Sequence, residues 1–180
     1  MQSAHSLLEH IAGLTSQRDL DLLSFSLLKS LHSMLKPKEI SMLRFNAALD
    51  PVQEIRFTNN DCQVVVDGIV VQQQLLDAVQ YMTSSESEKH DMPLQDEDRL
   101  CVYLMNESRR NATYLVIQMN HRISKSEDFL LAGVLEIFKN FGELIRYSQT
   151  DELTGLANRK TFESAINKVY EYRQYKSPVR

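Results

Sequence analysis

Few residues in this sequence could act in catalysis or bind a metal, and their spacing does not match that of a known kind of site. The five histidines lack metal-ligand spacing, and we expect each on the surface or on a helix rather than bound to zinc or haem. They are His5, His10, His32, His90 and His121. The acidic run from Asp96 to Asp98 has no organised set of partners and is expected to be a solvated turn. We therefore predict no catalytic, cofactor-binding or metal-binding residue in this chain.

The two cysteines are also far apart. Cys62 and Cys101 do not have the C-x-x-C spacing of a metal or redox motif, and a reducing compartment fits them. Either thiol could anchor a bilin or take part in redox chemistry. An ordinary buried cysteine is the simpler interpretation, because free cysteine behaves as a small apolar residue.

Composition and charge favour an ordinary globular protein. The formal net charge of −4 argues against a nucleic-acid-binding domain, which would be basic, and we expect no nucleic-acid partner. The small basic cluster Lys36-Pro37-Lys38 is explained as a solvated turn. No signal peptide is visible, and the most apolar run, Phe129 to Phe138, contains Glu136 and is too short to span a bilayer. We predict a cytoplasmic protein without a membrane segment in this chain.

Apolar periodicity and capping signals predict an α+β domain. Helices are expected over residues 3–14, from the capping signal at Ser16 and Asp19 to the stop at Pro37, over 69–82 and over 125–149. Strands are expected near residues 40–45, 54–57, 63–66, 99–107 and 112–120. Thr83 to Asp98 has little apolar content and is predicted to be a loop. It could be a simple solvated loop or a mobile lid over a ligand pocket.

The last predicted helix, which a Ser124–Glu127 capping box begins, carries two apolar stripes. The first stripe is Leu130, Val134, Ile137, Phe141 and Leu144. The second is Leu131, Leu135, Phe138 and Ile145. One packing seam needs one stripe, so two stripes favour a helix that packs on its own sheet and also on a second helix. A single wide core-facing stripe is the alternative. We take the first stripe as the seam of a homodimer; moving the seam to the second stripe corresponds to a rotation of about 100°.

A nine-residue string after this helix looks like a capped turn between two helices. Asp151 and Thr154 favour helix boundaries, Gly155 allows a positive φ, and Asn158 is a suitable N-cap for a following helix. The string resembles the D-x-L-T-G-L-x-N-R signature that opens the GGDEF family of diguanylate cyclase domains. Its fixed positions are Asp151, Leu153, Thr154, Gly155, Leu156, Asn158 and Arg159. We treat them as an interdomain coupling motif, in which the resemblance implies a pairing of Asp151 with Arg159.

The resemblance covers only residues 151–180, and no Gly-Gly-Asp-Glu-Phe string follows. It implies that the chain is cut just inside a GGDEF domain whose active site is missing. Such domains condense two GTP molecules into cyclic di-GMP. GTP and Mg²⁺ are therefore expected only in the missing part, and no enzymatic activity is expected of the chain by itself.

The order of elements before this motif resembles that of the GAF family of sensor domains, with the PAS family as the close competitor. A GAF-like domain implies an antiparallel sheet with helices packed on one face and space for a small-molecule ligand on the other. We divide the chain into an N-terminal helix (1–15), a GAF-like domain (16–123), a signalling and dimerisation helix (124–150) and the start of a GGDEF domain (151–180).

Two functions remain open. The first is a sensor and dimerisation module that controls the attached GGDEF domain, with an unidentified ligand or cofactor. The second is a ligand-free PAS-like or GAF-like dimerisation scaffold attached to an inactive GGDEF-like domain.

Overall fold

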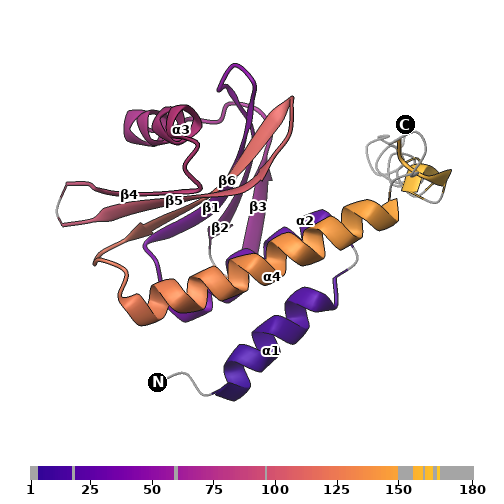
Figure 1. The fold of residues 1–180 in the computed structure, drawn as a ribbon, viewed down its shortest axis with the longest axis horizontal. Coiled ribbons are helices and arrows are strands. Elements are labelled where there is room, and N and C mark those ends of the chain that lie inside the picture. The colour runs from indigo at the N-terminus through magenta and orange to yellow at the C-terminus, as the bar shows by residue number, and fades with distance from the viewer. Residues whose placement is uncertain are drawn as a thin grey trace, which may run out of the picture. The chain divides into compact units, whose positions relative to one another are not determined.

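The computed structural model describes residues 4–17, 19–58, 61–95, 97–149, 156–159, 161–163 and 166. Four helices and six strands lie within these ranges (Figure 1). The helices are α1 (Ala4–Thr15), α2 (Leu20–Leu35), α3 (Gln73–Ser85) and α4 (Lys125–Gln149). The strands are β1 (Glu39–Asn46), β2 (Pro51–Thr58), β3 (Asp61–Val65), β4 (Lys89–Pro93), β5 (Arg99–Glu107) and β6 (Asn111–Met119). The α+β class predicted from the sequence is confirmed.

The strands form one antiparallel sheet in the order β3-β2-β1-β6-β5-β4. Its two central strands, β1 and β6, come from opposite ends of the sheet-forming segment and pair along their whole length, for example Ile40 with Ile117. Both strands are buried on each face over most of their length, which explains their nearly continuous apolar sequences. The remaining pairs join strands that follow one another in the chain.

Helix α2 covers one face of the sheet. Asp19 caps its first turn by accepting hydrogen bonds from the backbone N–H groups of Asp21 and Leu22. The helix ends at Lys36, next to Pro37, as the sequence predicted. Lys36 has the left-handed conformation that often follows a helix end. Buried leucines line the helix. The ring of His32 packs against that of Phe57 on β2, with the ring centroids 4.7 Å apart.

Helix α3 lies on the opposite face (Figure 1). Its buried residues, among them Val79 and Met82, pack on side chains of β1, β5 and β6. Phe45 and Tyr114 meet edge-on within this core, with ring centroids 5.9 Å apart. The expectation that helices pack on only one face was therefore wrong, although α3 leaves part of its face uncovered.

The predicted loop from Thr83 to Asp98 was also wrong. Helix α3 continues to Ser85, and β4 then pairs with β5 along the edge of the sheet, Asp91 opposite Cys101. An edge strand with charged residues is hard to recognise in a sequence, because such residues protect an exposed edge from further pairing. Since these residues belong to the sheet, they do not form a mobile lid.

The chain forms two compact units, Met1–Lys139 and Asn140–Arg180, and the boundary falls within α4. In the first unit, α4 buries Leu131, Val134, Leu135 and Phe138. Among the described residues, no helix is both long and apolar enough to cross a membrane.

Candidate functional site

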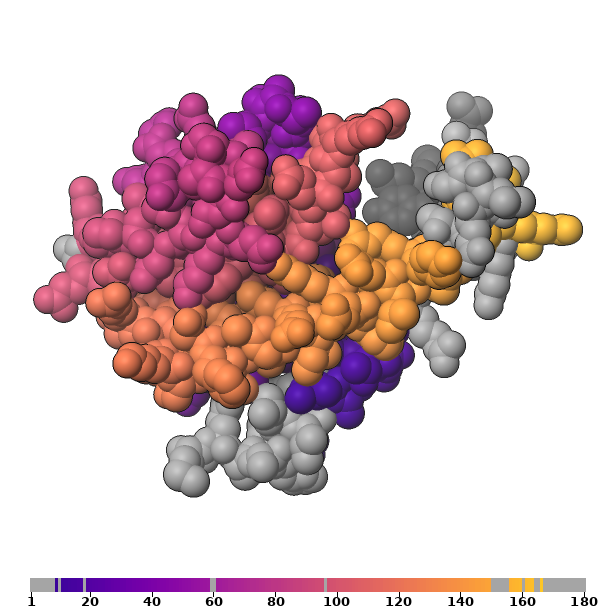
Figure 2. Space-filling model, viewed as in Figure 1, coloured from indigo at the N-terminus to yellow at the C-terminus, as the bar shows by residue number. Residues whose placement is uncertain are grey.

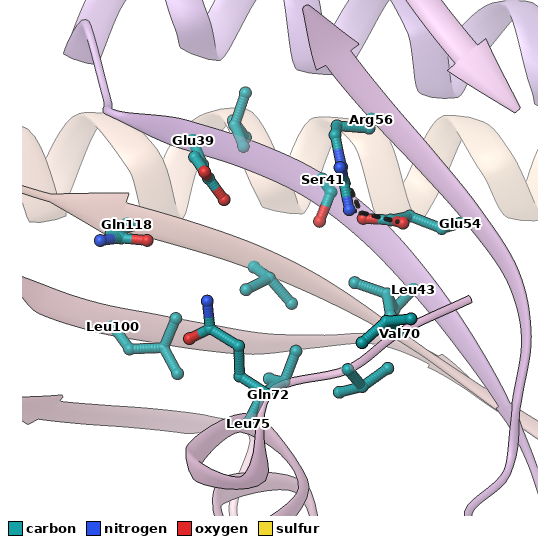
Figure 3. Close-up of a pocket in the computed structure, with 13 residues that line it drawn as sticks. Glu39, Ser41, Leu43, Glu54, Arg56, Val70, Gln72, Leu75, Leu100 and Gln118 are labelled. Carbon is teal, nitrogen blue, oxygen red and sulfur yellow. Dashed lines mark hydrogen bonds and ion pairs between the residues drawn. The ribbon is translucent and has the colours of Figure 1, made fainter. Parts of the chain in front are cut away.

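The part of the sheet face that α3 leaves open holds a cavity of about 80 Å³. Strands β1, β2, β5 and β6 form its floor, and the segment from Val70 to Leu75 forms its rim. Figure 3 shows polar side chains from β1 and β2 on one side, and on the other side mostly apolar side chains together with the amide of Gln72. The polar side chains are Glu39, Ser41, Glu54 and Arg56, and the apolar ones are Leu43, Val70, Leu75 and Leu100. A ligand with one polar and one apolar side would match this lining.

An ion pair forms the polar wall. Glu54 and Arg56 are two residues apart on β2, so both point to the same face. The Arg56 Nε and Nη2 atoms donate to the two carboxylate oxygens of Glu54, each at 3.0 Å (Figure 3). Glu54 is only 5% exposed, whereas the Arg56 side chain is about half exposed. The Nη1 group of Arg56 takes no part in these two hydrogen bonds. It can therefore donate a hydrogen bond to a ligand.

A second charged cluster closes the end of the cavity at Gln118. Asp98 is buried and accepts hydrogen bonds from Lys38 Nζ at 2.6 and 2.7 Å and from Gln118 Nε2 at 2.9 Å. The Gln118 oxygen is thereby turned toward the cavity (Figure 3). The hydrogen bonds from Lys38 and Gln118 lower the pKa of the Asp98 carboxyl. The prediction of a solvated acidic turn was therefore wrong for Asp98, and Lys38 is not merely a solvated turn residue.

We expect Asp98→Asn to remove a pH-dependent part of the stability. Because the folded pKa lies below that of the unfolded chain, near 4, the ionised carboxylate stabilises the fold above that pH. This contribution is lost as the pH falls through the folded pKa. Urea unfolding at pH 7, 5, 4 and 3 should show the wild type more stable at pH 7 and the difference shrinking toward pH 3. Asp67→Asn, at an exposed carboxylate, is the control, and a difference that does not change with pH would contradict the assignment.

The cysteines are placed as ordinary packed residues. Cys62 lies against α2, with its Sγ 3.9 Å from the Phe25 carbonyl oxygen, and Cys101 is buried beside Asp91. Burial raises the pKa of both thiols, that of Cys101 to about 12 with help from the Asp91 charge. Both thiols are therefore protonated at neutral pH and poorly nucleophilic. Within the described ranges, no His, Cys, Asp and Glu side chains cluster as metal ligands would.

The coupling motif is described only in part. Asp151, Leu153, Thr154 and Gly155 lie outside the described residues, and with them the expected pairing of Asp151 with Arg159. Leu156 is exposed, and Arg159 Nε donates to Glu163 at 2.8 Å.

Asn158 makes several hydrogen bonds within the described part of the motif. Its side-chain oxygen accepts from the Thr161 N–H at 3.0 Å, which makes it the N-cap that the sequence predicted. Its own N–H donates to the Gln149 carbonyl at 2.9 Å and its side-chain amide to that of Ser148 at 2.7 Å. One residue thus binds the end of α4 and begins the next helix.

The two stripes of α4 differ in burial. The second stripe is internal, with Leu131 1% and Ile145 6% exposed. In the first, Leu130, Ile137 and Phe141 are half-buried, and Leu144 is 65% exposed. Val134 is already buried within the single chain. A dimer seam would therefore use the other four, and a seam on the second stripe would have to expose Leu131.

Comparisons with known proteins identify the fold. No protein-family model matches the chain, and no curated protein matches it. A crystal structure of the GAF domain from Acinetobacter phosphoenolpyruvate-protein phosphotransferase is similar, at 9% identity and a TM-score of 0.54, over 82% of this chain and 96% of that one.

Two further structures are also similar. One is a methyl-accepting chemotaxis protein, residues 122 to 287, at 8% identity and a TM-score of 0.55, over 80% of this chain and 99% of that one. The other is the far-red-absorbing dark state of a protein with bound biliverdin IXa, at 11% identity and a TM-score of 0.50, over 79% of this chain and 99% of that one. Similarity at such low identity shows the fold alone, and the fold of this chain is similar to that of a GAF domain.

Proposed function

We propose that the chain is a cytoplasmic regulatory module that senses a small molecule and, as a homodimer, controls a GGDEF-family domain beginning at Asp151. That domain would make cyclic di-GMP from two GTP with Mg²⁺. The observation that carries the proposal is the set of hydrogen bonds that Asn158 makes at the end of α4.

The Asn158 contacts supply a mechanical connection. The last carbonyl groups of a helix have no partner within it, and Asn158 satisfies those of Ser148 and Gln149. The same side chain accepts from Thr161 and so starts the helix that follows. A change in the direction or rotation of α4 would therefore be passed on through one residue. In the GGDEF signature this asparagine is a fixed position.

In this proposal the sheet-face cavity is the site that binds the ligand. Its wall combines the donor of Arg56, the oxygen of Gln118 and an apolar floor, which would fix the orientation of a small ligand. A ligand shifts a conformational equilibrium only by its difference in affinity for the two states.

Cysteine crosslinking tests the dimer. In a background without Cys62 and Cys101, the variant Leu144→Cys should form a covalent dimer under mild oxidation, because Leu144 is exposed on the proposed seam. The matched control is Ile145→Cys, at a position 6% exposed, which should crosslink far less. Equal crosslinking at both positions, or none at position 144, would reject this seam.

The test of coupling uses this chain joined to a complete GGDEF-family domain. With it attached, the protein should turn GTP into cyclic di-GMP, and Asn158→Ala should remove the effect of the Leu144→Cys crosslink on that turnover. Glu136→Gln, at an exposed position of α4 outside the motif, is the control. Turnover of GTP by the 180-residue chain alone would contradict the proposal.

The second candidate function is a ligand-free dimerisation scaffold joined to an inactive GGDEF-like domain. It is favoured by the small cavity of about 80 Å³ and by the mutual pairing of Glu54 and Arg56, which leaves neither charge in need of a ligand. A thermal-shift ligand screen decides between the sensor and the scaffold. A ligand that binds only the folded state raises the stability of the protein, so a shift favours the sensor.

A further inference from the structure

The register of the strands brings particular polar groups together in the sheet-face cavity. Glu39 on β1 lies directly opposite Gln118 on β6, and both line the cavity. Side chains two residues apart on a strand point to the same face, so Ser41 follows Glu39 along this face. Figures 1 and 2 show α3 above the sheet and the first turns of α4 below it, so α4 does not cover the cavity.

The Ser41 hydroxyl is a buried polar group without a partner in the chain. Ser41 is 9% exposed and lines the cavity, and its side chain forms no hydrogen bond with a described residue. Figure 3 shows its oxygen directed into the cavity. Among the described residues, the enclosed side-chain oxygens that lack a partner are those of Thr58 and Tyr103, so the Ser41 oxygen is not enclosed. A molecule in the cavity can therefore reach it.

Glu39 adds a negative charge that the chain does not neutralise. It is exposed at the start of β1 and makes no ion pair with another described residue. Lys38, its neighbour in the chain, is bound to Asp98. The other two charges that line the cavity, on Glu54 and Arg56, pair with each other. The unpaired charge of the cavity is therefore negative.

The rest of the lining fits a short ligand with an apolar body. The Gln118 amide nitrogen donates to Asp98, so the Gln118 oxygen remains as an acceptor beside Glu39. Leu75 and Leu100 line the apolar side. Since an apolar cavity of about 150 Å³ holds a benzene molecule, one of about 80 Å³ admits only a short aliphatic chain.

We propose that the sheet-face cavity binds a small primary ammonium compound with a short aliphatic body. An ammonium group has three N–H donors and no acceptor, which matches the Glu39 carboxylate, the Gln118 oxygen and the Ser41 hydroxyl. The aliphatic body packs on Leu75 and Leu100. An anion is disfavoured, because the unpaired charge in the cavity is negative. This proposal rests on the sensor function proposed above and names the chemical class of its ligand.

Calorimetry and ligand-observed NMR on the 180-residue chain test the ligand class at pH 7. The probe is n-butylamine, which is protonated at this pH as a lysine side chain is. 1-Butanol lacks its charge, butyrate reverses the charge, and tetramethylammonium lacks the N–H donors. Butylamine should bind at millimolar concentration or better, and at least about tenfold more tightly than each of these controls. Equal binding of a control, or no binding of butylamine, overturns the proposal.

Two variants locate the binding. Glu39→Gln, at an exposed position, should weaken binding of butylamine about tenfold or more and remove its preference over 1-butanol. Ser41→Ala should weaken it about threefold to tenfold without loss of stability, because the hydroxyl has no partner in the unliganded chain. The matched control is Glu107→Gln, at an exposed carboxylate of β5 outside the cavity, which should leave binding unchanged. Equal weakening by Glu39→Gln and Glu107→Gln would mean non-specific attraction of a cation to an acidic protein, and would reject this site.

Failure of this ligand class and failure of the sensor function give different results. If 1-butanol or butyrate binds, Ser41→Ala weakens that binding, and butylamine does not bind, then the ammonium assignment is wrong and the sensor function stands. If no probe binds, and a wider thermal-shift screen also finds no ligand, the ammonium assignment and the sensor function both fail, and the scaffold is favoured.

Discussion

Replacing Leu131 by alanine should lower the free energy of unfolding by about 2–5 kcal/mol, the range for a fully buried leucine. Leu131 is 1% exposed, so the substitution removes apolar contacts and leaves a cavity. The matched variant Leu130→Ala, one residue earlier on the half-buried stripe, should cost much less. Urea unfolding of dilute protein measures both. Similar losses for the two variants would mean that the stripes do not differ in their packing within the chain.

The same pair of variants separates folding from self-association. If the first stripe is the dimer seam, Leu130→Ala should weaken the dimer in analytical ultracentrifugation, since apolar area is lost from the interface rather than from the core. Leu131→Ala should leave the dimer intact at temperatures where the variant is folded. A dimer that is insensitive to Leu130→Ala would remove this residue from the seam.

The difference in burial between the two stripes limits how α4 can transmit a conformational change. A rotation of about 100° that placed the second stripe in a dimer seam would have to remove Leu131 and Leu135 from the interior. The cost of exposing them makes a large rotation of the first half of the helix unfavourable. A change confined to the end of α4, near the exposed Leu144 and the carbonyl groups that Asn158 binds, would leave Leu131 and Leu135 buried and would have to move only Ile145.

Local signals in the sequence were sufficient for α4, whereas the helix predicted over 69–82 runs from Gln73 to Ser85 and has no side-chain cap at its start. The bounds of α4 were predicted correctly, because the Ser124–Glu127 box marks its start and the apolar stripes continue to its end. Lys36-Pro37 likewise marked the end of α2, but the capping signal at Ser16 and Asp19 placed its start too early, because Asp19 rather than Ser16 is the N-cap. Such signals are reliable because capping and backbone conformation depend on neighbours within a few residues.

The edge strand β4 and the charged clusters could not be predicted in the same way. Lys38 and Asp98 are sixty residues apart, and only the pairing of β1 with β6 brings Lys38 beside Gln118. The Glu54–Arg56 pair left a fainter signal, since Ile55 and Phe57 alternate with it and require the two charges to share one face. The sequence does not indicate that α3 covers part of this face, or that Glu54 is buried there.

The Glu54–Arg56 pair gives the second large expected effect. Arg56→Ala should lower the free energy of unfolding by about 1–3 kcal/mol, because it leaves a carboxylate that is 5% exposed without either of its hydrogen-bond donors. Solvent around the half-exposed arginine screens the attraction, which favours the lower end of that range. Arg44→Ala, at an exposed arginine on β1, is the control and should change stability by no more than about 0.5 kcal/mol.

A double-mutant cycle with Glu54→Gln isolates the pair. In the Glu54→Gln background, Arg56→Ala should cost less than in the wild type, because no buried charge is then left unpaired. Urea unfolding of the four proteins gives the coupling free energy as the difference between the two costs. A coupling near zero would mean that water already satisfies Glu54. The polar wall of the sheet-face cavity would then not be held in place by this ion pair, and its orientation toward a ligand would have to come from the Asp98 cluster alone.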